Sequence, residues 1–154
     1  MMSFLVNRRD LNQMKKKAAV YRYDEIDIGS VHSFTRTITH DDVLKFAELS
    51  GDLNPLHLSE VFGRSSQFGK NVVHGMLTAS HFSTLLGMYC PGEKCLYLGQ
   101  TLLFKMPLFY DDTVKVKGTV VKKVDTLNIL TMKTEIFRDK DLIVSGEAQI
   151  QLID

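Results

Sequence analysis

The segment GDLNPLH, from Gly51 to His57, brings an acid, an amide, a proline and a histidine together. Pro55 restricts the backbone between Asp52 and His57, so a turn could point both side chains into one cavity. A carboxylate there could accept a proton from a water molecule, and the imidazole could orient that water or supply a proton. Such a pair could add water to a double bond, or remove it, without a metal ion.

Each of these side chains also has an ordinary structural explanation. Asp52 precedes an expected helix start, where a carboxylate is stabilised electrostatically, and His57 could be a half-buried histidine bonded to the backbone. Asn54 followed by Pro55 is typical of a helix start, with a side-chain acceptor at the N-cap and proline in the first turn. The explanations are compatible, because a helix that begins at Asn54 would hold His57 facing Asp52.

A second group of interest is the glycine of VVHGML. We expect Gly75 at the N-terminus of a helix, where a glycine lets a ligand approach the backbone closely. The free N–H groups and the dipole of that helix end would favour an oxyanion, such as the enolate oxygen of a thioester. The alternative is that Gly75 serves only the packing of the helix on a sheet.

The pattern of apolar residues predicts several short helices and an extended sheet. A strand over Val31–Ile38 is followed by a helix that begins at Thr39, with Asp42 completing an acidic variant of the capping box. A short helix from Asn54 through Phe62 and a loop over residues 63–70 come next. Four strand-like segments then cover residues 96–104, 114–124, 127–137 and 142–152. Consecutive strands with short links indicate an antiparallel sheet.

Residues 71–92 carry no formal charge when histidine is counted as neutral. We expect a helix here from His74 to about Gly87. Its serine, threonine and histidine side chains argue against a membrane span, although the uncharged stretch is long enough for one. A helix without charges must then be buried against the apolar face of the sheet. The expected class is α+β, with a curved antiparallel sheet around a central helix.

The composition narrows the class of protein. The length of 154 residues suits one domain, and a net charge of +1 argues against nucleic-acid binding through a basic face. Cys90 and Cys95 are too few for a disulfide framework or a zinc site. No second acid or histidine stands at a metal-ligand spacing near Asp52 and His57, so we expect no metal site.

The basic start of the chain is expected to lie outside the folded domain. Residues 1–22 would form a solvated, poorly ordered arm, and residues 23–154 a single domain. The arm lacks the apolar core of a secretory signal, so we expect a cytoplasmic protein. An organelle matrix, reached through a transit peptide, is the alternative that the basic, acid-poor arm leaves open.

Four segments share the pattern of one enzyme family. They are SGDLNPLHL, then HGMLTASHFSTLLG beginning seventeen residues after His57, then YLGQTLLFKMPLFYDDTV and SGEAQIQL. Together they resemble the MaoC-like (R)-specific enoyl-CoA hydratases over about residues 28–153. The resemblance implies a hot-dog fold and the reversible addition of water to trans-2-enoyl thioesters, giving (R)-3-hydroxyacyl thioesters without a cofactor. The acyl group would be carried on CoA or on an acyl carrier protein.

The resemblance also implies roles for individual residues. Asp52 and His57 match the catalytic pair of the family, and Asn54 matches the asparagine that helps to hold the loop geometry. Gly75 matches the glycine whose backbone N–H faces the thioester oxygen. These roles agree with the chemistry that the residue types suggest by themselves.

Two positions on the central helix complete the expected site. Ser83 matches a serine near the active site of the family. Leu86, three residues later on the same helix face, would line the acyl pocket, although ordinary core packing explains it equally well. The family also implies a homodimer whose two sheets join edge to edge, with the substrate near the interface. Such pairing would cover the open edges of a curved sheet.

Other functions remain open from the sequence. A hot-dog acyl-CoA thioesterase would cleave the thioester, usually with a carboxylate on or beside the central helix, but residues 71–92 contain no Asp or Glu. A 3-hydroxyacyl-carrier-protein dehydratase of fatty acid synthesis would run the hydration in reverse. A non-catalytic acyl-thioester-binding module would not need the pair Asp52 and His57. Arg64 and Lys70 could meet substrate phosphates, or could be solvated surface charges.

Overall fold

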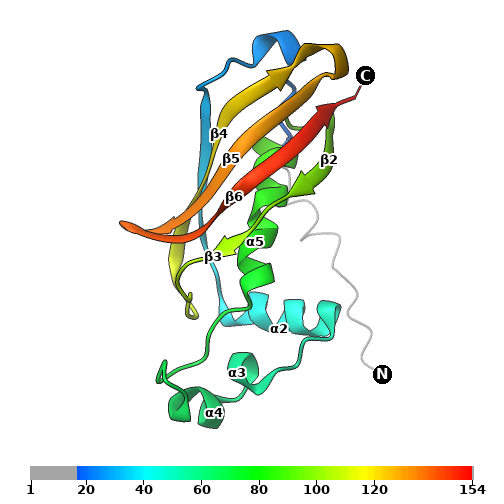
Figure 1. Ribbon diagram of the computed structural model, residues 1–154. Helices are drawn as coiled ribbons and strands as arrows, with labels where there is room; N and C mark the ends of the chain where they lie inside the picture. Colours follow the sequence, from blue (N-terminus) through cyan, green and yellow to red (C-terminus); the bar gives the residue numbers. More distant parts are fainter. Residues whose placement is uncertain (1–16, 154) are drawn as a thin grey trace.

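One antiparallel sheet curves around a helix in the computed structural model, which describes residues 17–153 (Figure 1). The strands are β1 (Val31–Thr37), β2 (Cys95–Gln100), β3 (Leu103–Phe104), β4 (Thr113–Val124), β5 (Ile129–Arg138) and β6 (Asp141–Leu152). Their order is β1-β4-β5-β6-β2, and β3 also pairs with β6. The predicted α+β class and antiparallel sheet are therefore confirmed.

A row of apolar side chains crosses the middle of the sheet. Phe34 on β1 lies opposite Val116 on β4, Val116 lies opposite Ile136 on β5, and Ile136 lies opposite Val144 on β6. The last three side chains are fully buried. β-branched side chains suit such paired positions because they pack well on a pleated surface. This row forms part of the core between the sheet and the helix.

The sequence predicted one continuous strand over residues 96–104, and that prediction was wrong because the segment forms two strands. The register of β2 against β6 shifts between Tyr97 and Gly99, and β3 starts only at Leu103. Between them the backbone crosses closely over β6. A Cβ atom at Gly146 would lie only 1.8 Å from the carbonyl oxygen of Thr101. Glycine at position 146 is therefore required for this crossing.

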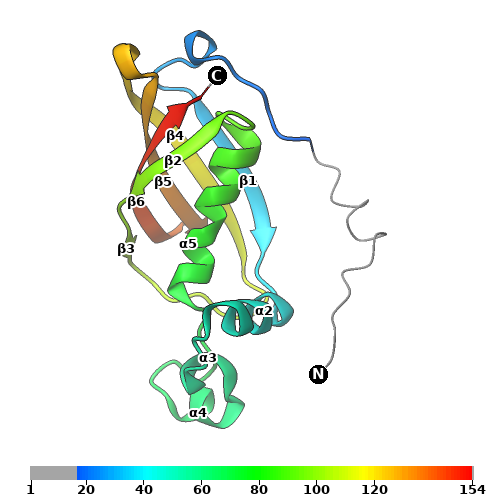
Figure 2. The same ribbon diagram turned by 90° about the vertical axis from the view of Figure 1, so that its right-hand side faces the viewer.

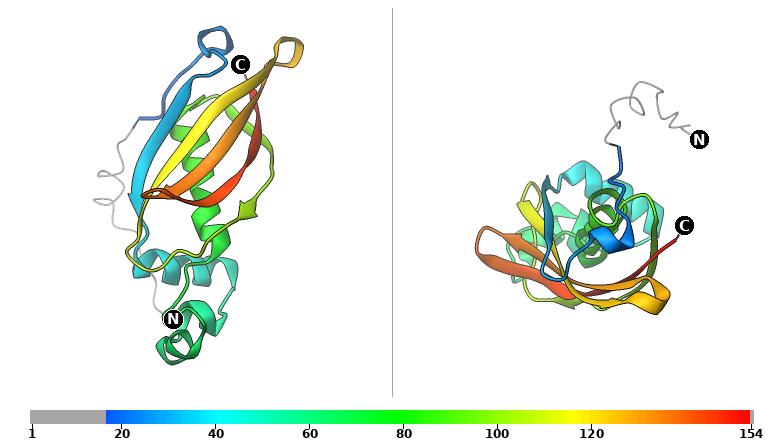
Figure 3. Two further views of the ribbon diagram at one scale, coloured as in Figure 1. Left: turned by 60° about the vertical axis from the view of Figure 1, so that its left-hand side comes forward. Right: turned by 90° about the horizontal axis from the view of Figure 1, so that it is seen from above.

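The central helix α5 (Gly75–Thr84) lies lengthwise along one face of the sheet, between the edge strands β1 and β2 (Figure 2). It continues as a π-helical segment, η2 (Leu85–Tyr89), so the predicted helical span from His74 to Gly87 is close to the observed one. Seen from above, the strands curve around this helix (Figure 3). Phe82, Leu85 and Leu86 are buried between helix and sheet.

The helix is buried against the sheet, as expected, but it is not buried on every side. Met76, Ser80, Ser83 and Thr84 are exposed, and their spacing of three to four residues places them on one face. Three of these four side chains are small and carry a hydroxyl group, which is solvated by water without bearing a charge. Lack of charge therefore did not distinguish a buried helix from one with an uncharged outer face.

Three short helices precede α5 and extend beyond the end of the sheet (Figures 1 and 2). They are α2 (His40–Ser50), α3 (Pro55–Leu58) and α4 (Glu60–Ser65). The capping box that Thr39 and Asp42 predicted for α2 is present, with hydrogen bonds in both directions. The predicted single helix through Phe62 is divided at Ser59, whose hydroxyl caps α4 by accepting the N–H of Phe62.

The first described residues run along the loop that follows α5. The N–H of Ala19 donates to the carbonyl of Met88, and Glu93 donates to the carbonyl of Ala19. Two single-turn helices follow at η1 (Tyr23–Glu25) and η3 (Asp125–Leu127). Most of the predicted basic arm, residues 1–16, lies outside the described part of the chain. Within the described part, no helix is long and apolar enough to cross a membrane.

Candidate active site

The loop between α2 and α3 is shaped by its own side chains. Helix α2 ends at Gly51, which has a left-handed backbone with φ of 77°. The carboxylate of Asp52 accepts the N–H of Asn54 at 3.2 Å, and the side-chain oxygen of Asn54 accepts the N–H of Leu56 at 3.0 Å. Asn54 is the N-cap of α3 and Pro55 stands in its first turn, as the sequence predicted.

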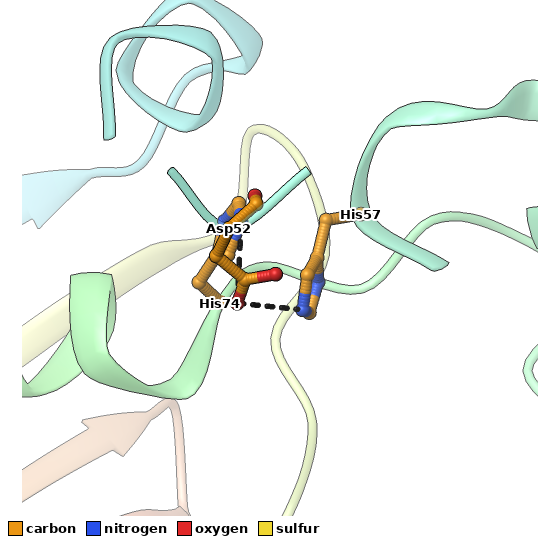
Figure 4. Close-up of side chains that lie close together, drawn as sticks. All are labelled: Asp52, His57 and His74. Carbon is orange, nitrogen blue, oxygen red and sulfur yellow. Dashed lines mark hydrogen bonds and ion pairs between the residues drawn. The ribbon is translucent and has the colours of Figure 1, made fainter. Parts of the chain in front are cut away.

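His57 presents one nitrogen to Asp52. Its Nδ1 lies 2.7 Å from the carbonyl oxygen of Val72, and a carbonyl can only accept, so Nδ1–H is the donor. In the neutral ring this leaves Nε2 as an acceptor, 4.0 Å from Oδ2 of Asp52 (Figure 4). That distance exceeds a direct hydrogen bond. The His57 side chain is only 13% exposed, whereas that of Asp52 is 51% exposed.

His74 is a third member of the site that the sequence reasoning missed. Its Nε2–H donates to the main-chain oxygen of Asp52 at 3.0 Å, and its ring stacks on His57 with centroids 3.8 Å apart (Figure 4). The His74 side chain is 2% exposed. The sequence spacing, which showed no second acid or histidine at a metal-ligand distance along the chain, did not reveal this histidine, which lies close to the pair in space. His74 fixes both the backbone of Asp52 and one face of the His57 ring.

Ligand-type atoms of Asp52, His57 and His74 lie within 4.8 Å of one another, which raises the question of a metal ion. The two imidazole rings are stacked with 30° between their planes. A metal ion binds in the plane of each imidazole, and nearly parallel planes do not meet between the rings. The Nε2–H of His74 also donates to a carbonyl. The arrangement suits positioning of the side chains better than metal binding.

Residues from elsewhere in the chain satisfy carbonyl groups in and beside the short helix α3. The carbonyl of Pro55 accepts the N–H of Ser59 at the C-cap, but a four-residue helix leaves its later carbonyls without such partners. The side-chain amide of the buried Asn71 donates to the carbonyls of Leu56 and Ser59 at 3.0 and 2.9 Å. The hydroxyl of Tyr110 donates to the carbonyl of His57. Asn71 and Tyr110 thus hold the helix that carries His57.

A pocket of about 310 Å³ brings His57 and Gly75 together. Its remaining walls are mainly apolar, with Phe104 and Met106 on one side. Gly75 is the first residue of α5, so its N–H has no partner inside the helix. A Cβ atom at Gly75 would lie 3.0 Å from the Phe104 ring, which makes glycine important for the shape of the pocket. The pocket can therefore offer an N–H group close to His57.

The structure does not bring Ser83 and Leu86 into this pocket. Ser83 stands eight residues after Gly75, about 12 Å along the helix, and is exposed on its outer face. Leu86 is fully buried in the core against the sheet. Within a single chain, the ordinary core explanation of Leu86 is the one that fits. Ser83 could contribute to a site only if another surface packed against the outer face of α5.

Known proteins were compared with the chain in sequence and in structure. A family model described as MaoC like domain matches residues 13–139. The (R)-specific enoyl-CoA hydratase of Aeromonas caviae is 40% identical over 128 residues, or 82% of this chain and 96% of that protein. The mitochondrial 3-hydroxyacyl-acyl-carrier-protein dehydratase FERN of Solanum lycopersicum is 35% identical over 130 residues, or 82% of this chain and 78% of that protein.

Solved structures agree with these sequence matches. The (R)-hydratase from A. caviae involved in PHA biosynthesis has a TM-score of 0.81 over 83% of this chain and 98% of that chain. R-hydratase PhaJ1 from Pseudomonas aeruginosa in the unliganded form has a TM-score of 0.82 at 34% identity, over 86% of this chain and 85% of that chain. The chain therefore belongs to the MaoC-like family and has its hot-dog fold, as the sequence motifs implied.

Proposed function

We propose that the protein is an (R)-specific enoyl-CoA hydratase, a hydro-lyase that adds water reversibly to trans-2-enoyl thioesters. The observation that carries this proposal is the position of Asp52 and His57 beside the pocket that contains Gly75. Two hydrogen-bonding side chains 4.0 Å apart can each contact one water molecule between them. The resemblance to the A. caviae enzyme supports the same reaction.

In the proposed mechanism, the water oxygen forms a bond to the β-carbon of the enoyl thioester. Asp52 accepts a proton from this water while Nε2 of His57 orients it. The electron pair of the double bond moves toward the thioester carbonyl, and the N–H of Gly75 stabilises the enolate oxygen. A proton passed on by the pair then reaches the α-carbon, so the net change is the addition of one water molecule.

We also propose that two copies of the chain form a homodimer through the edge strand β2 and the outer face of α5. Strand β2 pairs with β6 on only one side, so its other edge is open. Large apolar side chains are exposed nearby, including Leu96, Leu98 and Met76. A second copy would cover these groups and would bring Ser83 of α5 into an interface. Phe104 and Met106 would then line a pocket near that interface.

Two other enzyme activities must be distinguished from the proposed one. The plant relative named above supports a 3-hydroxyacyl-carrier-protein dehydratase as the second candidate. A thioesterase would need a carboxylate near the central helix, and the carboxylate of Asp52 lies 3.9 Å from Nε2 of His74, the residue before that helix. We place the enzyme in the cytoplasm, a proposal that the free thiols of Cys90 and Cys95 support.

A direct assay tests the proposed reaction. Purified protein is given crotonyl-CoA, and the loss of conjugated enoyl absorbance is followed together with the release of free thiol. The proposal predicts loss of absorbance without thiol release, and a product oxidised by an (R)-specific but not an (S)-specific 3-hydroxyacyl-CoA dehydrogenase. Thiol release at the rate of the absorbance change would indicate a thioesterase. An (S) product would contradict the proposed stereochemistry.

A further inference from the structure

The loop that carries Asp52 has few connections to the rest of the protein. Within residues 17–153, the hydrogen bonds of Gly51–Asn54 lead to the loop itself, to the end of α2 or to the start of α3, with one exception. The exception is the carbonyl of Asp52, which accepts the Nε2–H of His74 from 22 residues away (Figure 4). This one hydrogen bond therefore ties the loop to the central helix.

His74 is itself firmly held. It is the N-cap residue of α5 and stands directly before Gly75. Its side chain is buried and packs against two rings, with centroids 5.1 Å away at Phe46 on α2 and 3.8 Å away at His57 on α3. The residue that anchors the Asp52 loop therefore belongs to the same helix start that offers the Gly75 N–H to a substrate.

Only one ring nitrogen of His74 makes a hydrogen bond. A carbonyl can only accept, so the hydrogen lies on Nε2 and is donated to Asp52. The other nitrogen, Nδ1, is buried and has no partner in the described part of the chain. A proton on Nδ1 would create a buried donor without an acceptor, which is unfavourable. His74 is therefore suited to act as a fixed donor rather than to transfer protons.

The two contacts of His74 with the catalytic pair differ in how easily other contacts replace them. Without the ring stack, His57 keeps the hydrogen bonds that Val72 and Tyr110 make with it. Without the Nε2–H donor, the carbonyl of Asp52 has no other partner among residues 17–153, and the loop loses its anchor. The hydrogen bond to Asp52 is therefore the contact that the rest of the site cannot replace.

We propose that His74 is a positioning residue of the hydratase site, and that the reaction requires its hydrogen bond to Asp52 rather than its ring stack. The proposal rests on the proposed hydratase function. Through this bond, His74 sets the position of the Asp52 carboxylate relative to the Gly75 N–H. Both groups must meet one substrate at the same time, because water attacks the β-carbon while charge develops on the thioester oxygen.

Three substitutions separate the hydrogen bond from the ring stack. His74→Gln places an amide N–H near the position of Nε2, whereas His74→Asn places its amide near Nδ1, which has no partner. His74→Phe keeps a ring that can stack on His57 but has no donor. With crotonyl-CoA, His74→Gln should keep a kcat close to that of wild type. His74→Asn and His74→Phe should each lose about tenfold to a hundredfold in kcat with KM unchanged.

The matched control is His81→Phe, on the same helix. The Nδ1 of His81 contacts only carbonyls of α5 itself, so this variant should keep the wild-type kcat. Wild-type kcat in His74→Phe, or equal losses in His74→Phe and His74→Gln, would overturn the proposal.

Amide hydrogen exchange of the segment Gly51–His57 provides a measurement that does not depend on turnover. Exchange should be faster in His74→Asn and His74→Phe than in wild type and His74→Gln, because only the first two lack the anchoring donor. A protein that shows this pattern but hydrates no crotonyl-CoA keeps His74 as the anchor of the loop and loses the hydratase function. Equal exchange in all four proteins would contradict the anchoring role.

Discussion

His57 is fixed by three separate contacts before any substrate binds. Its Nδ1–H donates to Val72, its ring stacks on His74, and its main-chain oxygen accepts the hydroxyl of Tyr110. Side chains that must meet a reacting group gain most when their orientation is set in advance. The position of Nε2 relative to Asp52 therefore depends on residues that do not take part in the reaction.

Tyr110→Phe tests this support directly. Burial raises the pKa of Tyr110, so its hydroxyl remains a donor throughout the neutral range. Loss of that donor leaves the His57 carbonyl without its partner, and small displacements of a catalytic group can cost tenfold to a hundredfold in rate. We expect kcat for crotonyl-CoA to fall by about tenfold, with KM unchanged. Tyr97→Phe, whose hydroxyl bonds Gln100 away from the site, is the control. Equal losses in both variants would argue against a specific role for Tyr110.

The sequence predicted that Asp52 and His57, the proposed catalytic pair, lie close together because they stand five residues apart around one turn. The cap of α3 at Asn54 could be predicted for the same reason. His74 contacts Asp52 from 22 residues away, and Tyr110 contacts His57 from 53 residues away. Contacts of this kind depend on how the loop, the central helix and the sheet come together. Local residue patterns do not show such contacts directly, although the position of His74 next to Gly75 was a signal that it could lie near the expected site.

At the scale of secondary-structure elements, the N-terminal cap of α2 stabilises the helix that leads into the Asp52 loop. Burial alone would raise the pKa of Asp42, but hydrogen bonds with Thr39 and the charge of Arg36 lower it overall. Folding therefore favours the ionised carboxylate. The contribution of this carboxylate to stability is complete above its pKa in the unfolded chain, about 4. It is lost as the pH falls through the lower pKa that the carboxylate has in the folded protein.

Asp42→Asn should therefore destabilise the protein in a pH-dependent way. We expect a loss of about 1 kcal/mol in the free energy of unfolding at pH 7, because Asn keeps an acceptor for the Thr39 N–H but loses the negative charge at the helix start and the ion pair with Arg36. The loss should shrink in urea titrations at pH 3, because the carboxylate of the unfolded chain is then largely protonated and its charge no longer favours folding in full. Asp41→Asn is the control, because its ion pair with Lys45 is exposed and contributes little. A loss of the same size at both pH values would exclude the charged cap as its cause.

Gly75→Ala tests the role of the N-terminus of α5. The added methyl group would lie 3.0 Å from the Phe104 ring, inside the pocket that contains His57. We expect kcat/KM for crotonyl-CoA to fall at least tenfold, because the Gly75 N–H would be blocked from the thioester oxygen. Gly87→Ala is the matched control, since a Cβ there meets nothing within 4 Å. Comparable kcat/KM values for the two variants would contradict the oxyanion role of Gly75.

The elements themselves were largely predictable, and their interruptions were not. Alternating apolar residues indicated β4, β5 and β6, and the capping residues indicated α2 and α3. The break after β2 depends on the chain crossing Gly146, and the exposed face of α5 depends on what lies opposite it. Both are consequences of tertiary packing, so a single-sequence pattern could not show them.

At the scale of the whole molecule, we propose a dimer that forms through the exposed face of α5 and the open edge of β2. Thr84→Lys places a charge on that face, where it is harmless in a monomer and unfavourable in an interface. We expect the wild type and Thr126→Lys, a control in the exposed η3 turn, to run as dimers in light scattering. Thr84→Lys should shift toward the monomer. A wild-type monomer at micromolar concentration would rule out the proposed assembly.

The central claim is that Asp52 and His57 work as one acid/base pair. The most direct test is the rate of crotonyl-CoA hydration by wild type, Asp52→Asn, His57→Ala and the double variant, each with a wild-type circular dichroism spectrum. We predict that each single variant loses about 100-fold to 10,000-fold in kcat. The double variant should lose little more than the worse single variant, because residues that act as a unit are not additive. Full activity in either folded single variant, or losses that multiply, would contradict the paired mechanism.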